Sequence, residues 1–402
     1  MNRVKKLLHR NIKLIIALLL FIVISAGVTY SASTYLYNSN VIGYDNGNSG
    51  LNATDVQSAL DELYNTYANN TGCPEGYTQY SLSGSDGFKC IITMGISDIL
   101  SDAVMDNIAS TYVTNSTGIK FSAISSDTNG KGLYILSGTE NNAYPIYYYR
   151  GAVTNNNVLF ANFCWKIVRT TDTGGVKLIY NGLPASGKCT NTTGTSTMLS
   201  TTTAFNTNYD NKIYIGYTYN NNGTNTNSTI KTVIDNWYAS NMKSYTSYLE
   251  DTIWCNDRRV SSTSPSGNTI YYGAFGRLID NNQPSLNCSQ ASDRYTVSSA
   301  NGNGLLTYPV GLLTADELVY AGGKYNTSNN TYYLYNGASF WLGSPLDFGN
   351  GYVRARVAYV ASGLLNGYTV RDTFSVRPAV SLKNGIVFTG GDGTSVSPYV
   401  VE

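Results

Sequence analysis

Two pairs of neighbouring carboxylates, Glu250-Asp251 and Asp316-Glu317, have the residue types that glycoside hydrolysis needs. In such enzymes one carboxyl group acts as an acid and the other as a base or a nucleophile. Asp316 and Glu317 also follow Thr314 in the pattern of a capping box, which closes the first turn of a helix. Acidic side chains in that turn stabilise the helix dipole. The pattern therefore favours a structural role, and we predict no catalytic residue.

The segment Ser228-Thr229-Ile230-Lys231 matches SxxK, a motif in which the serine of penicillin-recognising enzymes is the nucleophile. It opens an apolar pattern at helical spacing, formed by Ile230, Val233, Ile234 and Trp237. No Lys-Thr-Gly follows it, and a serine at this position is a favourable helix N-cap. The motif therefore predicts a helix that begins at Ser228 or Thr229, not a nucleophile.

The chain contains one histidine, His9, which precedes a long apolar run. The rest of the chain therefore lacks the imidazole that Ser–His and Cys–His pairs need. No CxxC spacing occurs, so the cysteines do not predict a zinc site. The segment Asp127-Thr128-Asn129-Gly130 lacks the later bidentate glutamate of a calcium loop, and we interpret it as a turn. We expect no metal and no cofactor.

Six cysteines follow the apolar run, and an even number in an exported chain is typical of disulfides. Fifteen pairings are formally open. Pairing between sequence neighbours closes the shortest loops, and it predicts the bonds Cys73–Cys90, Cys164–Cys189 and Cys255–Cys288. Each bond would stabilise the fold by about 2–4 kcal/mol through its constraint on the unfolded chain.

Arginine and aromatic side chains in the C-terminal half are the candidates for ligand binding. Arg354 and Arg356 alternate with apolar residues and share one strand face, where they can grip a carboxylate or stack on an aromatic ring. The full candidate set is Arg354, Arg356, Tyr352, Trp341, Tyr271 and Tyr272. A structural role for these side chains is the alternative. Tyrosines also occur in runs, so neighbouring rings in a strand must point to opposite faces and some must be exposed.

The N-terminus predicts export. Residues 1–13 hold five basic side chains and form a cytoplasmic segment, and residues 14–32 form an apolar run of nineteen residues. At ~1.5 Å per residue this run is long enough to cross a bilayer. The basic flank places the bulk of the chain outside the cell. The run is either a single-pass anchor, which its length favours, or a signal peptide cleaved near Ser31 or Ser33, which would release a secreted protein.

Residues 33–69 read as a polar linker and a stalk helix that begins with a capping box at Thr54. The stretch SGLNATDVQSALDELY resembles a short module of phage tail fibres and bacterial surface proteins, which implies that the helix can bundle into a homo-oligomer. Residues 70–130 form a small region stapled by Cys73 and Cys90, with a hairpin turn at Gly84-Ser85-Asp86-Gly87. Residues 131–402 form the main extracellular domain.

Strand patterns dominate that domain. From Tyr147 to Gly182 we expect three consecutive strands, with Phe163, Trp165 and Ile167 on a buried face and Cys164, Lys166 and Val168 on the opposite one. The segment Thr171–Gly175 is a turn. The predicted fold class is α+β and mostly β, with two or three inserted helices and long Asn-rich loops. One of these helices follows Thr314 and ends at Gly322-Gly323.

Composition excludes nucleic acid as a partner. Only 13% of the residues are charged, and polarity comes from Asn, Ser, Thr and 35 tyrosines. Beyond residue 13 the chain has 21 basic and 25 acidic side chains, so it is mildly acidic. Phosphate backbones require clustered Lys and Arg, which are missing here. A surface of neutral polar groups and tyrosines suits glycans or proteins instead.

Residues from about Tyr147 to Ser381 resemble a group of uncharacterised exported proteins of low-GC Gram-positive bacteria and their wall-less relatives. The matching stretches are YYYRGAVTNNNVLFANFCWKIVR, GGVKLIYNG, YPVGLLTADEL, FWLGSP and VRPAVSL. More loosely, the part from FWLGSP to VRPAVSL is similar to C-type-lectin-like and formylglycine-generating-enzyme-like folds. No cysteine follows Cys288. The resemblance therefore implies ligand binding and not copper-dependent oxidation.

These observations together predict a membrane-anchored surface protein that adheres to a glycan or a protein through its β-rich domain. Two alternatives remain open. One is a cell-wall hydrolase that uses paired carboxylates, with Glu250 or Glu317 essential. The other is a structural surface protein that assembles with copies of itself.

Overall fold

The computed structural model describes residue 58 and residues 77–81, 88–92, 119–125, 132–136, 146–190, 193–199, 201–349, 351, 353–386 and 390–401. The chain divides into two compact units, Met1–Ile92 and Thr93–Glu402. The second unit is mostly β, with few helices and two disulfides in its described part. This confirms the predicted mostly-β class of the folded body.

The first unit contains a hairpin. Strand β1 (Tyr77–Ser81) pairs antiparallel with β2 (Phe88–Ile92), which confirms the predicted strands. Cys73 lies outside the described residues, so the Cys73–Cys90 bond stays a prediction. Residues 14–32, and the stalk helix apart from Ser58, also lie outside them. Among the residues described, no helix combines the length and the apolar character that crossing a membrane requires.

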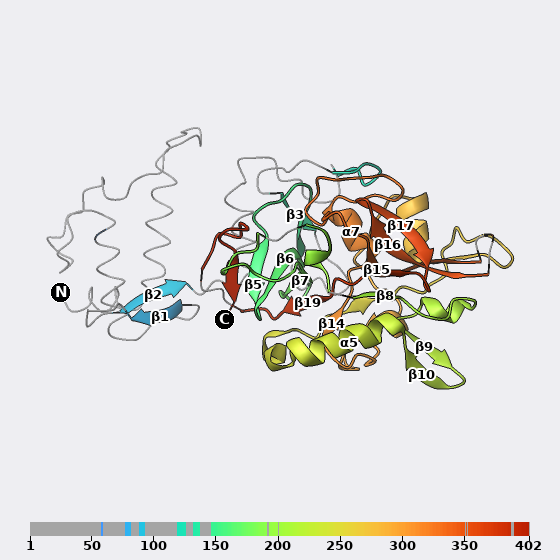
Figure 1. The fold of residues 1–402 in the computed structure, drawn as a ribbon, viewed down its shortest axis with the longest axis horizontal. Coiled ribbons are helices and arrows are strands. Elements are labelled where there is room, and N and C mark those ends of the chain that lie inside the picture. The colour runs from blue at the N-terminus through green and yellow to red at the C-terminus, as the bar shows by residue number, and fades with distance from the viewer. Residues whose placement is uncertain are drawn as a thin grey trace, which may run out of the picture. The chain divides into compact units, whose positions relative to one another are not determined.

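The first sheet of the second unit has eight strands in its described part, in the order β14-β19-β7-β6-β4-β3. Strand β5 also pairs with β6, and β20 pairs in parallel with β5. The strands are β3 (Leu133–Leu136), β4 (Ile146–Tyr149), β5 (Asn157–Phe160), β6 (Phe163–Thr170), β7 (Val176–Tyr180), β14 (Val310–Gly311), β19 (Ala379–Leu382) and β20 (Tyr399–Val401). In Figure 1, the green strand β7 lies beside the red strand β19, and β6 and then β5 follow it.

The second sheet has six strands in its described part, in the order β17-β16-β15-β18-β8, with β12 also paired to β15. They are β8 (Thr202–Ala204), β12 (Ile270–Tyr271), β15 (Phe340–Phe348), β16 (Ala355–Ala361), β17 (Leu364–Thr369) and β18 (Thr373–Ser375). Two further pairs are β9 (Thr218–Asn221) with β10 (Thr224–Asn227), and β11 (Trp254–Cys255) with β13 (Arg294–Tyr295).

The expected burial of one face of β6 is wrong, because both faces are buried. Phe163, Trp165 and Ile167 are buried as predicted, and so are Cys164 and Lys166 on the other face. The strand lies inside the sheet between β7 on one side and β4 and β5 on the other. Its second face is covered because Cys164 is bonded to Cys189 and Lys166 lies beside buried Asn156. The turn predicted at Thr171–Gly175 is confirmed, with Gly174 at φ +83°.

Two of the helices begin where the sequence predicts. Helix α5 (Thr229–Asn241) has Ser228 as its N-cap, whose hydroxyl accepts from the backbone N–H of Lys231. Helix α7 (Ala315–Ala321) begins with the complete capping box of Thr314 and Glu317 and ends at Gly322. Short helical turns complete the fold: η2 (Gly194–Thr197), η3 (Lys212–Ile215), η4 (Lys243–Tyr248), α6 (Gly273–Phe275), η5 (Gly276–Asp280) and η6 (Ala291–Asp293).

The two sheets share one core. Trp237 of α5 contacts Trp165 and Phe163 of β6, with ring centroids 6.3 Å and 5.7 Å apart. Helix α7 contacts β4 of the first sheet and β15 of the second. Arg377 lies between β18 and β19, where the chain passes from one sheet to the other. Helix α7 and the segment around Arg377 therefore connect the two sheets.

Candidate functional site

The residues that the sequence predicted to bind a ligand do not form one surface. Tyr352 lies outside the described residues. Trp341 is 1% exposed, and its ring nitrogen donates to the carbonyl of Thr203 at 2.8 Å. Tyr272 is 4% exposed. Trp341 and Tyr272 are therefore core residues, and their burial argues against direct contact with a ligand.

Arg356 and Tyr271 are neighbours across β12, β15 and β16, with Asp347 between them. Nη1 of Arg356 lies 2.9 Å from Oδ2 of Asp347, and its Nη2 donates to the carbonyl of Gly367. Burial raises the pKa of Asp347, and the charges of Arg356 and Arg354 act in the opposite direction. Both arginines therefore act on a buried carboxylate, which is the structural role named as their alternative.

The sequence predicted that some rings in the tyrosine runs are exposed, but both rings of Tyr332-Tyr333 are buried, at 1% and 8% exposed. These residues lie in a turn and not in a strand, so the alternation of a strand does not apply to them. In the run Tyr147-Tyr148-Tyr149, the first ring is half-buried and the other two are buried.

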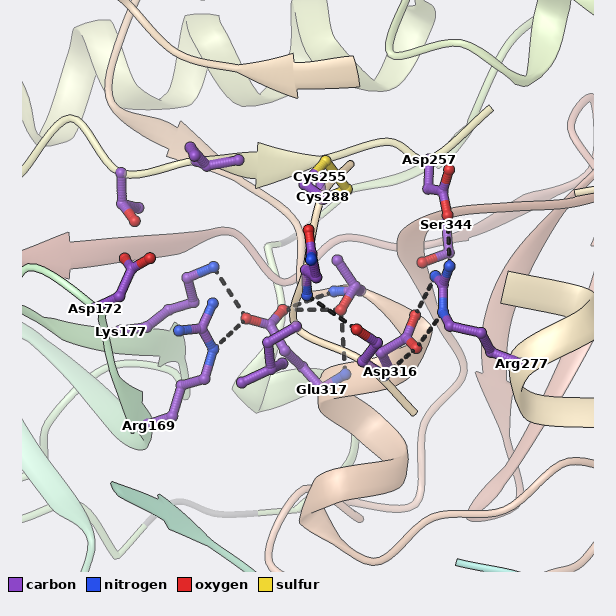
Figure 2. A pocket seen from close by; sticks show the side chains of 16 residues that line it. Arg169, Asp172, Lys177, Cys255, Asp257, Arg277, Cys288, Asp316, Glu317 and Ser344 are labelled. Carbon is purple, nitrogen blue, oxygen red and sulfur yellow. Dashed lines mark hydrogen bonds and ion pairs between the residues drawn. A yellow bond between two sulfur atoms is a disulfide. The ribbon is translucent and has the colours of Figure 1, made fainter. Parts of the chain in front are cut away.

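Charged side chains gather around a small cavity of about 40 Å³ (Figure 2). We call it the charged cavity, and its charged lining residues are Arg169, Asp172, Lys177, Asp257, Arg277, Asp316 and Glu317. They come from β6, β7 and the turn between them, from η5 and α7, and from the segment after β11. A water molecule needs roughly 10–15 Å³ of such volume, so the space suits a few waters and not a sugar or a peptide.

Glu317 forms the centre of one half of this cavity. Its Oε1 lies 2.8 Å from Nε of Arg169 and 2.9 Å from Nζ of Lys177, and its Oε2 accepts from the backbone N–H of Thr314. Burial alone would raise the pKa of Glu317, but Lys177 and Arg169 lower it to about 2. Burial and the charge of Arg169 lower the pKa of Lys177 to about 8. Glu317 and Lys177 are therefore both ionised at neutral pH.

Arg277 holds the other half together, as Figure 2 shows. Its Nε and Nη2 donate to the two carboxylate oxygens of Asp316, and its Nη1 donates to Asp257 at 2.5 Å. The backbone N–H of Ser285 also donates to Asp316. These carboxylates raise the pKa of Arg277, so its charge is permanent. Bidentate geometry of this kind fixes orientation as well as charge.

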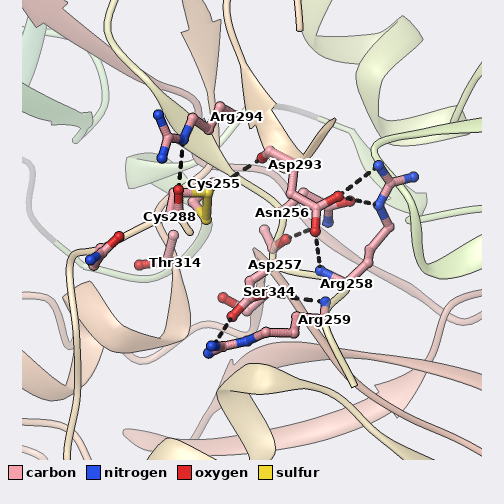
Figure 3. The surroundings of a disulfide bond; sticks show 12 residues. Cys255, Asn256, Asp257, Arg258, Arg259, Cys288, Asp293, Arg294, Thr314 and Ser344 are labelled. Atoms are coloured by element: carbon pink, nitrogen blue, oxygen red, sulfur yellow. Dashed lines mark hydrogen bonds and ion pairs between the residues drawn. A yellow bond between two sulfur atoms is a disulfide. The ribbon is translucent and has the colours of Figure 1, made fainter. Parts of the chain in front are cut away.

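The disulfide Cys255–Cys288 lies against the same cavity (Figure 3), which confirms that predicted pairing. It fixes β11 to the segment that precedes η6. Asp293 nearby accepts from the backbone N–H and from Nε of Arg258, each at 2.7 Å. The carbonyl of Cys288 accepts from Nε of Arg294. The predicted pairing Cys164–Cys189 is also confirmed. The Cys255–Cys288 bond and the ion pairs of the charged cavity therefore hold the same part of the fold.

Glu250, the other carboxylate considered for hydrolysis, is held by three hydroxyl groups. Ser381 donates to it at 2.9 Å, Thr171 at 3.1 Å, and Thr173 forms a further short contact. Burial raises the pKa of Glu250. A β-carbon at Gly175 would collide with Oε2 of Glu250 and, at 2.6 Å, with the backbone carbonyl oxygen of Leu382, which favours glycine there. Among the described residues these contacts give Glu250 a structural position.

The side chains of the SxxK motif, like Glu250, are bonded to other residues of the fold. The hydroxyl of Ser228 caps α5, and Nζ of Lys231 lies 2.6 Å from Oδ2 of Asp235. Both side chains are buried, with Lys231 fully enclosed. Ser228 and Lys231 are therefore part of the packing and capping of α5, as the sequence favoured.

An open groove of about 640 Å³ is the second candidate site, and we call it the tyrosine groove. It is lined by one lysine and otherwise by neutral residues, namely Val153, Thr154, Lys166, Asn181, Thr193, Gly194, Asn330, Thr331, Tyr332, Tyr333, Tyr335, Asn336, Gly337 and Ser395. No Asp, Glu, His or Cys belongs to this lining. Its volume falls in the range of about 300–1,000 Å³ that is typical of ligand sites.

Hydrogen bonds hold the walls of the tyrosine groove. Nδ2 of Asn336 donates to the hydroxyl of Thr197 at 2.6 Å, and the carbonyl of Asn336 accepts from the backbone N–H of Gly194. The backbone N–H of Tyr333 donates to the carbonyl of Gly151. The loop that carries the tyrosines is therefore tied to η2 and to the segment between β4 and β5.

Arg377 lies behind the groove and is 1% exposed. Its three donor nitrogens reach the carbonyls of Tyr180 and Leu334 and Oδ1 of Asn181, at 3.0–3.1 Å. This contact assigns the amide of Asn181, because the oxygen faces Arg377 and the nitrogen faces away. Among the described residues, that nitrogen and the hydroxyls of Tyr332 and Tyr333 have no hydrogen-bond partner.

Comparisons of the chain with models of known families, with curated proteins and with solved structures found no match. We therefore infer function from the geometry of the charged cavity and of the tyrosine groove. Sequence reasoning singled out Glu317, Asp316 and the tyrosine runs, but it did not join Lys166, Asn181 and Tyr335 into one groove. A usable signal was the mixture of Asn, Thr and Tyr in Asn329–Asn336, a composition that suits a binding loop.

Proposed function

We propose that this protein binds a glycan in the tyrosine groove and presents that site at the cell surface. The open groove of about 640 Å³, lined by neutral polar side chains and tyrosines, is the observation that carries the proposal. Its volume accommodates one or a few sugar rings, whereas the charged cavity of about 40 Å³ has no such room.

The side chains of the groove match the chemistry of a sugar. Tyr335 is half-buried and offers a ring face and a hydroxyl, and Thr154, Asn330 and Thr331 are exposed hydrogen-bonding groups. Hydroxyl and amide groups donate and accept, which suits the many hydroxyls of a glycan. Tyrosine adds apolar area with little loss of conformational entropy on binding. A rigid groove of this composition favours recognition over chemistry.

Surface exposure is supported by the sequence and by the disulfides. The basic segment 1–13 and the apolar run 14–32 are typical of an exported, membrane-anchored chain. The bonds Cys164–Cys189 and Cys255–Cys288 require an oxidising compartment to persist. Export places the groove outside the cell, where glycans are accessible.

Steric closure of the groove tests the proposal. The full chain, in detergent, is applied to a glycan array, and any glycan that binds is titrated by calorimetry. Thr154→Trp places a large ring on an exposed lining position, and we expect it to weaken binding about 10-fold or more. Thr224→Trp makes the same change on exposed β10, away from the groove lining, and is the matched control.

Absence of binding to every glycan on the array would overturn the proposal. Equal loss of binding in both variants would also contradict it, because the groove would then have no special part. Hydrolysis of a bound glycan, detected as new reducing ends, would instead favour the hydrolase alternative.

A further inference from the structure

The tyrosine groove differs from the charged cavity in the partners of its cations. In the charged cavity, Arg169, Lys177 and Arg277 each form an ion pair with a carboxylate. Lys166 of the groove and Arg377 behind it form no ion pair among the described residues. Two buried positive charges therefore lie at one site without an opposite charge.

Lys166 has a single hydrogen-bond partner in the described part of the chain, Oδ1 of Asn156 at 3.3 Å. Its side chain is 8% exposed and belongs to the groove lining. An ammonium group has three donors, so it keeps donor capacity for a ligand. Asn156 is neutral, and its amide nitrogen is already bonded to the carbonyl of Ile167. The charge of Lys166 is therefore solvated only in part.

Arg377 is a second buried positive charge without an ionic partner in the described part of the chain. Its hydrogen bonds are all to neutral oxygens, and it fixes Asn181 so that the unpartnered amide nitrogen is the end turned away from the guanidinium. Asn181 and Lys166 both line the groove. The hydroxyls of Tyr332 and Tyr333 in the same lining also have no partner in the described chain. The groups without partners are thus donors or hydroxyls that can donate.

We propose that the ligand of the tyrosine groove is an acidic glycan, whose oxyanion binds Lys166 and the donors beside it. This inference rests on the proposed function and names its ligand class. A carboxylate or a sulfate on a sugar supplies acceptors to several donors at once, and the sugar rings occupy the neutral remainder of the groove. An anion would also neutralise the charge that the fold leaves unpaired.

Electrostatics agrees with this assignment. Burial lowers the pKa of Lys166 to about 8, and the charge of Arg377 acts in the same direction. Arg377 is the one charged group that acts on this pKa in the described part of the chain. A bound anion would raise the pKa again, so binding and protonation favour each other. Above pH 8 the free protein loses the charge, and binding of an acidic ligand weakens.

Calorimetry on the full chain in detergent tests the inference with three probes of equal length. They are oligomers of glucuronic acid, of glucose, and of glucose bearing sulfate. We expect an acidic oligomer to bind about 10–100-fold more tightly than the neutral one, because a hydrogen bond to a charged group is made only with the acid. Whichever acid binds more tightly distinguishes a carboxylate from a sulfate.

Lys166→Met should remove the preference for the acidic oligomer, so that the acidic and the neutral oligomer bind the variant with affinities within about twofold of each other. Lys212→Met removes the same charge from an exposed position outside the groove lining, and it should change neither. If Lys166→Met fails to fold, the wild-type protein still gives a test. Its affinity for the acidic oligomer should fall about tenfold between pH 7 and pH 9, whereas the neutral affinity should stay constant.

Equal or tighter binding of the neutral oligomer would overturn the inference and leave glycan binding in place. Binding of neither acidic oligomer would also overturn it, and the glycan array then decides separately whether the proposed function stands. A preference for the acid that survives in Lys166→Met, or that does not change with pH, would show that the anion binds elsewhere.

Discussion

The charged cavity and the tyrosine groove contain similar side chains in opposite arrangements. In the charged cavity each arginine and lysine lies within 3 Å of a carboxylate, and the remaining space is about 40 Å³. In the groove the hydrogen-bond partner of the lysine is a neutral amide, and the space is about 640 Å³. Charges that are satisfied within the chain hold the fold. The lysine without an ionic partner, next to an open volume, is the basis of the proposed ligand site.

The largest expected effect comes from removing the central carboxylate of the charged cavity, which tests whether its ion pairs stabilise the fold. Glu317→Gln should lower the free energy of unfolding by about 3–5 kcal/mol, because it leaves Arg169 and Lys177 buried without their anion. Urea unfolding monitored by tryptophan fluorescence gives the value. The exposed Asp210→Asn is the matched control and should change it by less than about 0.5 kcal/mol. A loss below about 1 kcal/mol in Glu317→Gln would show that the cluster is dispensable.

Acid should produce the next largest effect, and of the two sites it should act on the charged cavity, because the groove lining contains no carboxylate. The pKa of Glu317 is about 2 in the fold and 4.5 in its ordinary environment. The folded value is the lower one, so the stabilisation is complete above pH 4.5 and is lost as the pH falls through 2. The difference corresponds to about 3 kcal/mol. Unfolding curves of wild type and Glu317→Gln should therefore converge in this range, and parallel curves would contradict the assignment.

Substitution of one lysine in each site should change the stability of the protein by a smaller amount and in opposite directions. Lys166→Met should raise the stability of the ligand-free protein by about 1 kcal/mol at pH 7, because it removes a buried charge without an ionic partner. Lys177→Met should lower stability by about 2 kcal/mol, because Glu317 loses one of two cations and the contact over the Trp254 ring is lost.

The gain in Lys166→Met should depend on pH. The pKa of Lys166 is about 8 in the fold and 10.5 in its ordinary environment, so charging this lysine disfavours the folded state below pH 8. That penalty disappears as the pH rises from 8 to 10.5, and the gain in the variant should disappear with it. Chemical denaturation at pH 7 and pH 10 measures both differences. A loss of stability in both variants at pH 7 would remove the distinction between the two sites.

Local patterns in the sequence predicted the features that depend on neighbouring residues. The capping box at Thr314, the N-cap at Ser228 and the turn at Thr171–Gly175 are all in the structure. Pairing of nearest cysteines gave Cys164–Cys189 and Cys255–Cys288 correctly. Such features follow from hydrogen bonds and loop closure within a few tens of residues, which a single sequence displays directly.

Features that depend on distant residues could not be predicted in the same way. The sequence placed Lys166 on the less buried face of β6, since a lysine in an alternating strand usually faces water. In the structure Lys166 is buried and lines the same groove as Tyr332 and Asn336, which are far away in the sequence, and no local pattern reveals that proximity. Arg169 and Glu317 are paired across two separate parts of the chain for the same reason. Each candidate site is thus formed by segments that are distant in the sequence and come together only in the folded domain.

The parallel pairing of β20 with β5 has a consequence for how the chain folds. Residues Tyr399–Val401 lie against Val158–Phe160, so the first sheet joins segments from its beginning and from nearly the last residues of the chain. Contacts between such distant segments slow folding, because a long loop must close before they form. The edge of β5 therefore stays open until the segment Tyr399–Val401 has been synthesised. Export in an unfolded state, followed by rapid oxidation of Cys164 and Cys189, would suit a sheet of this topology.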